Sequence, residues 1–437
     1  VTANVTIQIP AVGYSQTLVV PANTVQTSAT IPKSGSQDAR LTAGGLYNTG
    51  IHITSDQPVV AYAHIYASSV SGATLLFPTN TLGSDYYSLN FTQTSNEVNS
   101  NSWFCVVATE DNTTVEITPS VATTDSKLTA GSPTTFLLNK GQVYNVMATT
   151  SGNNGGDLTG SRIRSVASAS GACKRIAVFS GSGKINIGCT SGTADNLYQQ
   201  VFPKSVWGKK YLTVPTSTLP NNYFRVAVSD PTTVVKWNGS VITGLVAGFY
   251  YEFLTKQPGV IESDKPIMVA QYISSQGCLN NGTPGDPEMI YLSPVEQTIN
   301  KVVLNSTPNY KITGHYINVV IKASGVNNFT LDGVNRASSF IAHPQDATYM
   351  YAQFTGLSAG QHTLASDSGF NAIAYGFGSA ESYGYNAGTN LKDLYQYISI
   401  DNKYATVNYP AGCKASPLRF AMTFPYQPTE IDWHFNG

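Results

Sequence analysis

Histidines and cysteines, the residues that most often carry catalysis or bind zinc, are scattered along this 437-residue chain. Zinc sites and catalytic centres usually show short fixed spacings such as HExxH, GxSxG or paired CxxC, and none of these occurs. The histidines stand far apart in the sequence: His52, His64, His315, His343, His362 and His434. The sequence therefore predicts no catalytic residues, no metal and no cofactor, although distant residues could still meet in the fold.

Acidic residues form one notable group, in the segment GTPGDPEM (282–289) with Asp286 and Glu288. Two carboxylates close together could bind a metal, whereas a Gly- and Pro-rich context is typical of a solvated turn. We interpret this segment as a turn. A metal site is the alternative.

A phrase with a lone aspartate recurs along the chain: IHITSDQPVVAYAHIY, GVIESDKPIMVAQY and LASDSGFNAIAYGF. A weaker copy, SASGACKRIAVFSG, has a cysteine at the corresponding place. With Asp56, Cys173, Asp264 and Asp367 aligned, the intervals are 117, 91 and 103 residues. Asp favours turns and Pro suits the start of a strand, so we interpret each phrase as a hairpin turn followed by a core strand. Calcium ligands or catalytic acids are the alternative, but each aspartate has no acidic neighbour within four residues except Glu262, and calcium prefers six or more oxygen ligands.

The cysteines indicate an oxidising compartment. Cys173 and Cys189 lie at equal distances from Gly181 in a Ser-Gly-Ser-Gly stretch between two short strand-like runs. If that stretch is a hairpin turn, the two cysteines face each other within disulfide reach, and we predict that they pair. Buried free thiols are the alternative. Cys105 and Cys278 are a second pair or two free thiols, and the partner of Cys413 is not predicted.

Composition narrows the class of protein. Only 11% of residues are charged, against about 25% in ordinary soluble domains, and the net charge is −1. No Lys/Arg cluster points to nucleic acid or anionic lipid, and no apolar run is long enough to span a membrane. We expect an exported protein, and either a signal peptide has been removed or the chain has been trimmed.

Short runs rich in Val, Ile, Thr, Tyr and Phe recur every 8–12 residues between turn residues, which predicts an all-β chain. A repeat of about 100 residues fits a two-sheet antiparallel sandwich better than a propeller blade of about 40–50 residues. We predict four tandem β-sandwich units at 1–80, 84–203, 208–294 and 300–388. A propeller-like arrangement is the alternative.

Two tyrosines are the candidate binding residues. Tyr383 and Tyr385 lie in SYGYNAG (382–388), which we interpret as a Gly-rich exit loop. Exposed rings there could stack on a sugar or on a partner protein. Ordinary tyrosines at a strand edge are the alternative.

Several phrases in a fixed order resemble the IgGFc-binding protein N-terminal domain family: RIAVFSGS, DNLYQQVFPKSVWGKKYLTVP, IESDKPIMVAQY, GDPEMIYLSPVEQ and SDSGFNAIAYGFGSAESYGYNAG. The resemblance runs from about residue 45 to 390 and implies a secreted, non-catalytic, all-β module. Animal members, which are richer in cysteine, occur in mucus-associated proteins, and the family name comes from binding antibody Fc. Bacterial members occur in large surface proteins of Bacteroidetes type with PKD-like domains and a type IX secretion tail. Residues 398–437 resemble the first half of a PKD-like or Ig-like domain.

The function that follows is a non-catalytic adhesion or binding module at the cell surface. Its expected partners are a glycan or a protein, with IgG Fc among the candidates. A secreted glycan-degrading enzyme and a purely structural spacer are the alternatives. The enzyme would need two carboxyl groups facing each other about 5–9.5 Å apart in a cleft.

Overall fold

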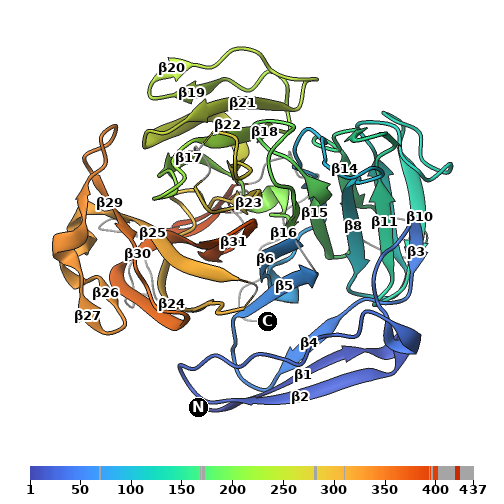
Figure 1. The fold of residues 1–437 in the computed structure, drawn as a ribbon, viewed down its shortest axis with the longest axis horizontal. Coiled ribbons are helices and arrows are strands. Elements are labelled where there is room, and N and C mark those ends of the chain that lie inside the picture. The colour runs from blue at the N-terminus through green and yellow to red at the C-terminus, as the bar shows by residue number, and fades with distance from the viewer. Residues whose placement is uncertain are drawn as a thin grey trace.

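Antiparallel strands build almost all of the fold in the computed structural model (Figure 1), so the all-β prediction is confirmed. The structure describes residues 1–437 except 68, 69, 168, 170–172, 280–282, 310, 393, 395, 396, 402–418 and 424–437. The helical elements within that part are short 3-10 turns: η1 (Pro10–Val12), η2 (Gly35–Gln37), η3 (Thr79–Thr81), η4 (Lys204–Val206), η5 (Ala323–Asn328) and η6 (Ala337–Ser339). No helix found there is long and apolar enough to cross a membrane.

One long bent strand organises the third set of strands. The first half of β22 (Gly259–Ile273) pairs with β17 (Gly208–Thr213) and β19 (Val235–Trp237). Its second half pairs with β18 (Asn222–Val228) and β23 (Glu288–Tyr291). The outer strands β20 (Ser240–Val241) and β21 (Tyr250–Thr255) pair with β19 and β18. The bent strand therefore runs through both layers of one seven-stranded sheet that folds over on itself.

The fourth set repeats this pairing order around β30 (Gly360–Gly378). The first half of β30 pairs with β24 and β26, and the second half pairs with β25 and β31. The outer strands again pair with β26 and β25. The strands of this set are β24 (Ile299–Ser306), β25 (Ile312–Lys322), β26 (Thr330–Leu331), β27 (Val334–Asn335), β28 (Ile341–Ala342), β29 (Tyr349–Phe354) and β31 (Glu381–Gly388).

The second set has the same order, with the long strand divided into β14 (Arg162–Ser165) and β15 (Ile176–Ile185). β14 pairs with β7 and β9, and β15 pairs with β8 and β16. The strands of this set are β7 (Asp85–Tyr87), β8 (Ser102–Ala108), β9 (Thr113–Thr118), β10 (Thr134–Leu138), β11 (Val143–Met147), β12 (Thr150–Ser151), β13 (Asn154–Gly155) and β16 (Asp195–Gln200).

In each of these sets, two layers of strands pack face to face. In the second set, Val115 and Ile117 of β9 share one apolar core with Phe104 and Val106 of β8. The third and fourth sets have cores of their own, built in the same way from alternate residues of both layers. Each of the three sets is therefore a two-layer β-sandwich.

The first set is incomplete by comparison. β1 (Ala3–Ile9), β2 (Tyr14–Val20) and β4 (His52–Ser55) form one sheet, and β5 (Ala61–Ala67) pairs with β6 (Val70–Leu76). β3 (Gly45–Tyr47) joins β11 of the second set instead. Among the described residues of 1–80, only Ala73 belongs to a buried core cluster. We propose that the four sets are repeats of one unit with the predicted bounds, which superposing them would test.

The inner strands of the four sets, β6, β16, β23 and β31, contact one another in a closed ring (Figure 1). Side chains bond across it: Gln199 Nε2 donates to the carbonyl oxygens of Ala73 and Gly384, at 2.8 and 3.1 Å. A ring of units is the feature shared with the propeller-like alternative. The complete units are nevertheless two-layered, with a strand that crosses between layers.

The recurring Ser-Asp phrase marks that crossing, and the hairpin interpretation is wrong. β22 and β30 run continuously through Asp264 and Asp367, and β4 and β5 on either side of Asp56 do not pair with each other. The carboxylate of Asp264 accepts from the Val234 amide at 2.8 Å, and that of Asp56 from the Asn4 amide at 2.7 Å. Asp56 and Asp264 therefore tie the bend to the segment beside it, where the chain crosses from one layer of strands to the other.

Cys173 is not the counterpart of these aspartates. Ser165 lies opposite Val115, as Ser55 lies opposite Val5 and Ser263 opposite Val235. The next residue, Val166, therefore occupies the aspartate position, and Cys173 lies in an insertion after it. In the C-terminal region, β32 (Tyr397–Asp401) pairs with β33 (Arg419–Thr423). The rest of the predicted PKD-like segment, with Cys413, lies outside the described residues.

Candidate functional site at the centre of the ring

Tyr383 and Tyr385 lie in β31, at the centre of the ring, and their rings are buried. The Tyr385 hydroxyl donates to the Asn305 carbonyl oxygen at 2.6 Å, and the Tyr383 hydroxyl lies 3.3 Å from His315 Nδ1. Both residues lie within a strand with their rings out of solvent, so the interpretation of 382–388 as a loop with exposed rings is wrong. The glycines misled the interpretation: a Cβ on Gly384 would lie 2.7 Å from Glu288 Cγ, so this glycine permits close packing and not a loop.

Asp286 and Glu288 are also buried, with 1% and 0% of their surfaces exposed, so the solvated-turn interpretation is wrong. Asp195, which begins β16, and Glu381, which begins β31, are buried in the same central region. We call these four residues the central acidic cluster. They lie together because equivalent ends of the inner strands converge at one end of the ring.

Backbone amides donate hydrogen bonds to two of the four carboxyl groups. Asp195 Oδ1 accepts from the amides of Ser71 and Asn196 at 2.6 and 2.7 Å. The amide of Met289 donates to Glu288 Oε1 at 2.9 Å. The second carboxyl oxygens of Asp195, Glu288 and Glu381 have no hydrogen-bond partner within the described part of the chain. Buried, half-satisfied carboxyl groups of this kind favour the protonated form.

The pKa values shift accordingly. Burial raises the pKa of Asp286 to about 7, and the charge of Glu381 adds to the effect. Burial, with the nearby charges of Asp286 and Glu288, holds the pKa of Asp195 well above its usual range. Burial likewise raises the pKa values of Glu288 and Glu381. The cluster therefore holds protons at or near neutral pH.

This cluster fits neither a metal site nor a glycosidase pair. Among the described residues, no three His, Cys, Asp or Glu side chains are grouped so that they could hold a metal ion. A glycosidase presents its two carboxyl groups to a sugar chain in an open cleft, whereas these four are 2% exposed or less. The four carboxyl groups can stay protonated where the inner strands of different units meet, which is a structural role.

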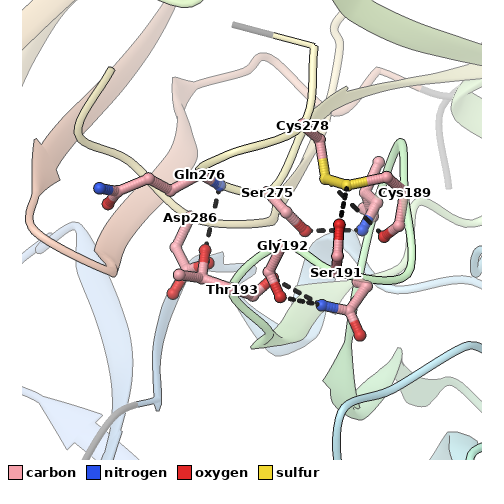
Figure 2. The surroundings of a disulfide bond; sticks show 10 residues. Cys189, Ser191, Gly192, Thr193, Ser275, Gln276, Cys278 and Asp286 are labelled. Atoms are coloured by element: carbon pink, nitrogen blue, oxygen red, sulfur yellow. Dashed lines mark hydrogen bonds between the residues drawn. A yellow bond between two sulfur atoms is a disulfide. The ribbon is translucent and has the colours of Figure 1, made fainter. Parts of the chain in front are cut away.

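A disulfide next to the cluster joins the second set of strands to the third (Figure 2). It links Cys189 to Cys278, with Cα atoms 5.5 Å apart, and Cys173 is an exposed free thiol. The predicted Cys173–Cys189 pair is wrong because Ile176–Ile185 is one continuous strand. Gly181 lies in its middle and not in a turn, so the strand, about 30 Å long, separates the two cysteines. Cys105 is buried and free.

The disulfide loop contacts the acidic cluster through Thr193. The Thr193 hydroxyl donates to Asp286 Oδ1, and it accepts from the Gln276 amide at 3.0 Å (Figure 2). Gln276 Oε1 accepts from the Ala380 amide of the fourth set at 2.9 Å. One hydrogen-bonded chain therefore links three of the four sets beside the disulfide.

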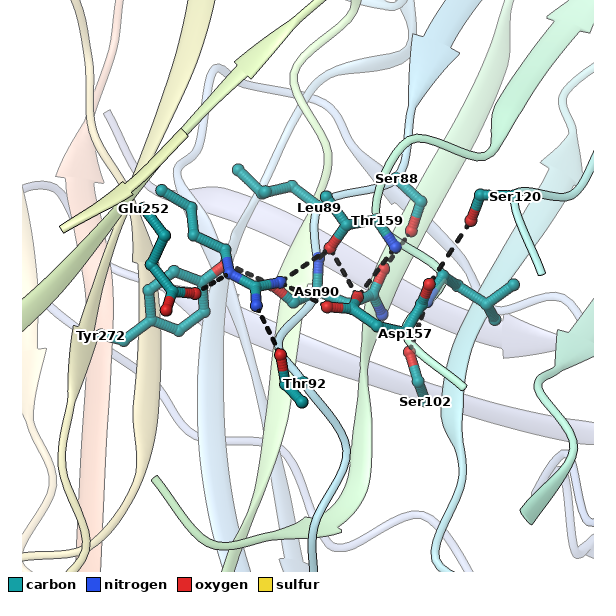
Figure 3. Close-up of polar contacts among 12 residues, drawn as sticks. Ser88, Leu89, Asn90, Thr92, Ser102, Ser120, Asp157, Thr159, Glu252 and Tyr272 are labelled. Atoms are coloured by element: carbon teal, nitrogen blue, oxygen red, sulfur yellow. Dashed lines mark hydrogen bonds and ion pairs between the residues drawn. The ribbon is translucent and has the colours of Figure 1, made fainter. Parts of the chain in front are cut away.

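A buried arginine forms a second junction between the second and third sets. Arg225 is 0% exposed, and its guanidinium contacts Asp157 at 2.6 Å and Glu252 at 2.7 Å. It lies between the rings of Phe91 and Tyr250, 4.3 and 4.2 Å from their centroids. The guanidinium donates to Glu252, Thr92 and Asp157, whose side chains are labelled in Figure 3. Sequence reasoning missed this group, and an arginine within the apolar run YFRVAV was the available signal.

Comparisons of the sequence with known proteins give a family and a relative. The family model described as "IgGFc binding protein" matches residues 72–376. The human IgGFc-binding protein is 24% identical over 369 residues, which are 82% of this chain and 6% of that protein. The chain therefore spans a small fraction of that relative's length. No solved structure matches.

Proposed function

This chain belongs to the IgGFc-binding protein family, and we propose that it is a non-catalytic, extracellular protein-binding module of a larger adhesion protein. The observation that carries the proposal is the family match, which runs through the second and third sets of strands and most of the fourth. The Cys189–Cys278 disulfide supports an oxidising, extracellular setting. The burial of every central carboxyl group supports a role other than catalysis.

We propose that recognition uses the loops that join the strands at the surface of the ring. Alternate strand residues are committed to the three cores and to the central ring, while loop side chains are free to contact a partner. With a net charge of −1, the surface offers little ionic steering. Hydrogen bonds and apolar contacts would then dominate, and affinity would change little with salt.

The wider setting is part of the same proposal. The sequence of residues 398–437 and the low cysteine content support a bacterial surface protein in which a PKD-like domain follows this module. A protein of that kind would display the module away from the cell, where its ligand is a host or neighbouring-cell protein.

A binding assay with the purified chain tests the function. Immobilised residues 1–437 would be exposed to IgG Fc, matched Fab fragments, mucin and a glycan array. We expect saturable binding to a protein probe that varies less than about threefold between roughly 50 and 500 mM salt. Degradation of a polysaccharide, lost when one of the four central carboxyl groups is changed, would overturn the proposal in favour of an enzyme.

A further inference from the structure

We propose that the outer edge of β2 is a self-association surface, where β2 of a second copy of this chain pairs antiparallel with it. The direction of the backbone groups along β1 shows which part of β2 is open. The Asn4 amide and carbonyl bond to Asp56, on the β4 side of the strand. Because these groups alternate along a strand, Val5 and Ile7 bond to Leu18 and Gln16 of β2.

The N–H and C=O groups of Ser15, Thr17 and Val19 therefore point away from β1. No described residue forms a hydrogen bond with them. Their side chains are exposed, and Val19 keeps 59% of its surface in contact with solvent. The outer edge of β2 thus presents the backbone N–H and C=O groups of three residues to solvent.

This edge lacks the features by which proteins protect exposed strands. Natural edges are usually short or carry lysine, proline or a bulge. The corresponding outer strands β20 and β27 have two residues each, and β10 has five, whereas β2 has seven with an unbroken register. The first 32 residues contain no Asp, Glu, Lys, Arg or His. A partner strand therefore meets no charge and no steric block within β2.

A second copy is the occupant that these groups fit. A two-fold axis at Thr17 pairs Thr17 with its copy and Ser15 with the copy's Val19, and each of these pairs exchanges two main-chain hydrogen bonds. Threonine opposite threonine is a favourable cross-strand pair. The two three-stranded sheets would become one continuous sheet, and the dimer would present two binding modules.

Sedimentation velocity on the full chain tests this pairing. Two neighbouring strands bury little surface, so we expect a reversible dimer with a dissociation constant of about 100 μM. The double variant Ser15→Lys/Val19→Lys places like charges on the edge and should weaken the dimer at least tenfold. Gln8→Lys adds a lysine to the same face one strand inward and should leave it unchanged. A chain that stays monomeric throughout, or a dimer unaffected by the double variant, overturns the proposal.

Cross-linking keeps the test independent of charge. With Cys173 changed to Ser to remove the exposed thiol, Thr17→Cys should form a covalent dimer under mild oxidation, because paired Cα atoms lie about 5.5 Å apart. Gln8→Cys in the same background should not. Equal cross-linking of both variants would show random collision and would reject the pairing. Binding of a protein probe by a strictly monomeric chain would reject the dimer and leave the proposed function standing.

Discussion

Arg225 Nη1 lies 2.6 Å from Asp157 Oδ2, and this contact joins the third set of strands to the second. The same nitrogen donates to the Asn90 carbonyl oxygen at 3.0 Å, and Nε contacts Glu252 at 2.7 Å. A buried cation with this many partners holds two units in one relative position. Removing this cation should therefore destabilise both units.

The first prediction concerns this arginine. Arg225→Met should lower the free energy of unfolding by about 3–5 kcal/mol, because it leaves the carboxylates of Asp157 and Glu252 without their cation. Arg164→Met, which removes a partly exposed pair with Glu116, should cost about 1 kcal/mol or less. Chemical denaturation of both variants measures the difference. Equal losses would show that the buried network has no special role.

The second prediction concerns the disulfide. Non-reducing peptide mapping should recover Cys189 linked to Cys278 and Cys173 as a free thiol. Replacing both bonded cysteines by serine should cost about 2–5 kcal/mol, because the bond closes a long loop in the unfolded chain. Cys173→Ser is the control and should leave the melting temperature unchanged. A linked Cys173–Cys189 peptide would contradict the structure.

The third prediction concerns pH. Burial raises the pKa of Asp286 from 3.8 to about 7, so above pH 4 the unfolded chain releases a proton that the folded chain keeps. This group's contribution to stability therefore falls as the pH rises from about 4 to 7, by at most about 1.4 kcal/mol per pH unit. Asp286→Asn should remove that fall, so its melting temperature should gain on the wild type as pH rises.

A carboxylate of opposite behaviour serves as the control for that experiment. The hydrogen bond from Lys265 holds the pKa of Asp230 well below its usual range. Its contribution is present above the unfolded pKa and is lost only as pH falls into the acid range. Asp230→Asn should therefore differ from wild type in neutral solution and converge with it in acid. The two variants diverging from wild type over the same pH range would contradict the assignment.

The fourth prediction concerns Tyr385, which packs beside Tyr383 in the central ring. Tyr385→Ala should cost about 3–5 kcal/mol because it opens a cavity in the central ring. Tyr385→Phe keeps the ring and should cost about 1–3 kcal/mol, since the Asn305 carbonyl loses its donor. Ligand affinity of the folded Tyr385→Phe variant should match wild type. A specific loss of affinity with stability unchanged would restore these tyrosines as a binding site.

The all-β class was readable from the sequence. Apolar runs of period two and turn residues report local backbone preference, and a recurring phrase reports a recurring local structure. The alignment of Asp56 and Asp264 was correct for the same reason, since both lie one residue past equivalent register positions. Their role was not readable. A Ser-Asp step between two apolar runs looks the same whether the chain folds back on itself or crosses from one layer of strands to the other.

Only the tertiary structure decided what is buried and what is bonded. Glycines at 384 and 388 predict a loop locally, yet they lie where inner strands from different units pack against each other. Cys189 forms a disulfide with Cys278, 89 residues away, because the ring brings the second and third sets together at that end. Asp195, Asp286, Glu288 and Glu381 became one cluster for the same reason. Local sequence carries backbone preference, whereas contacts between distant strands depend on how the units close around the ring.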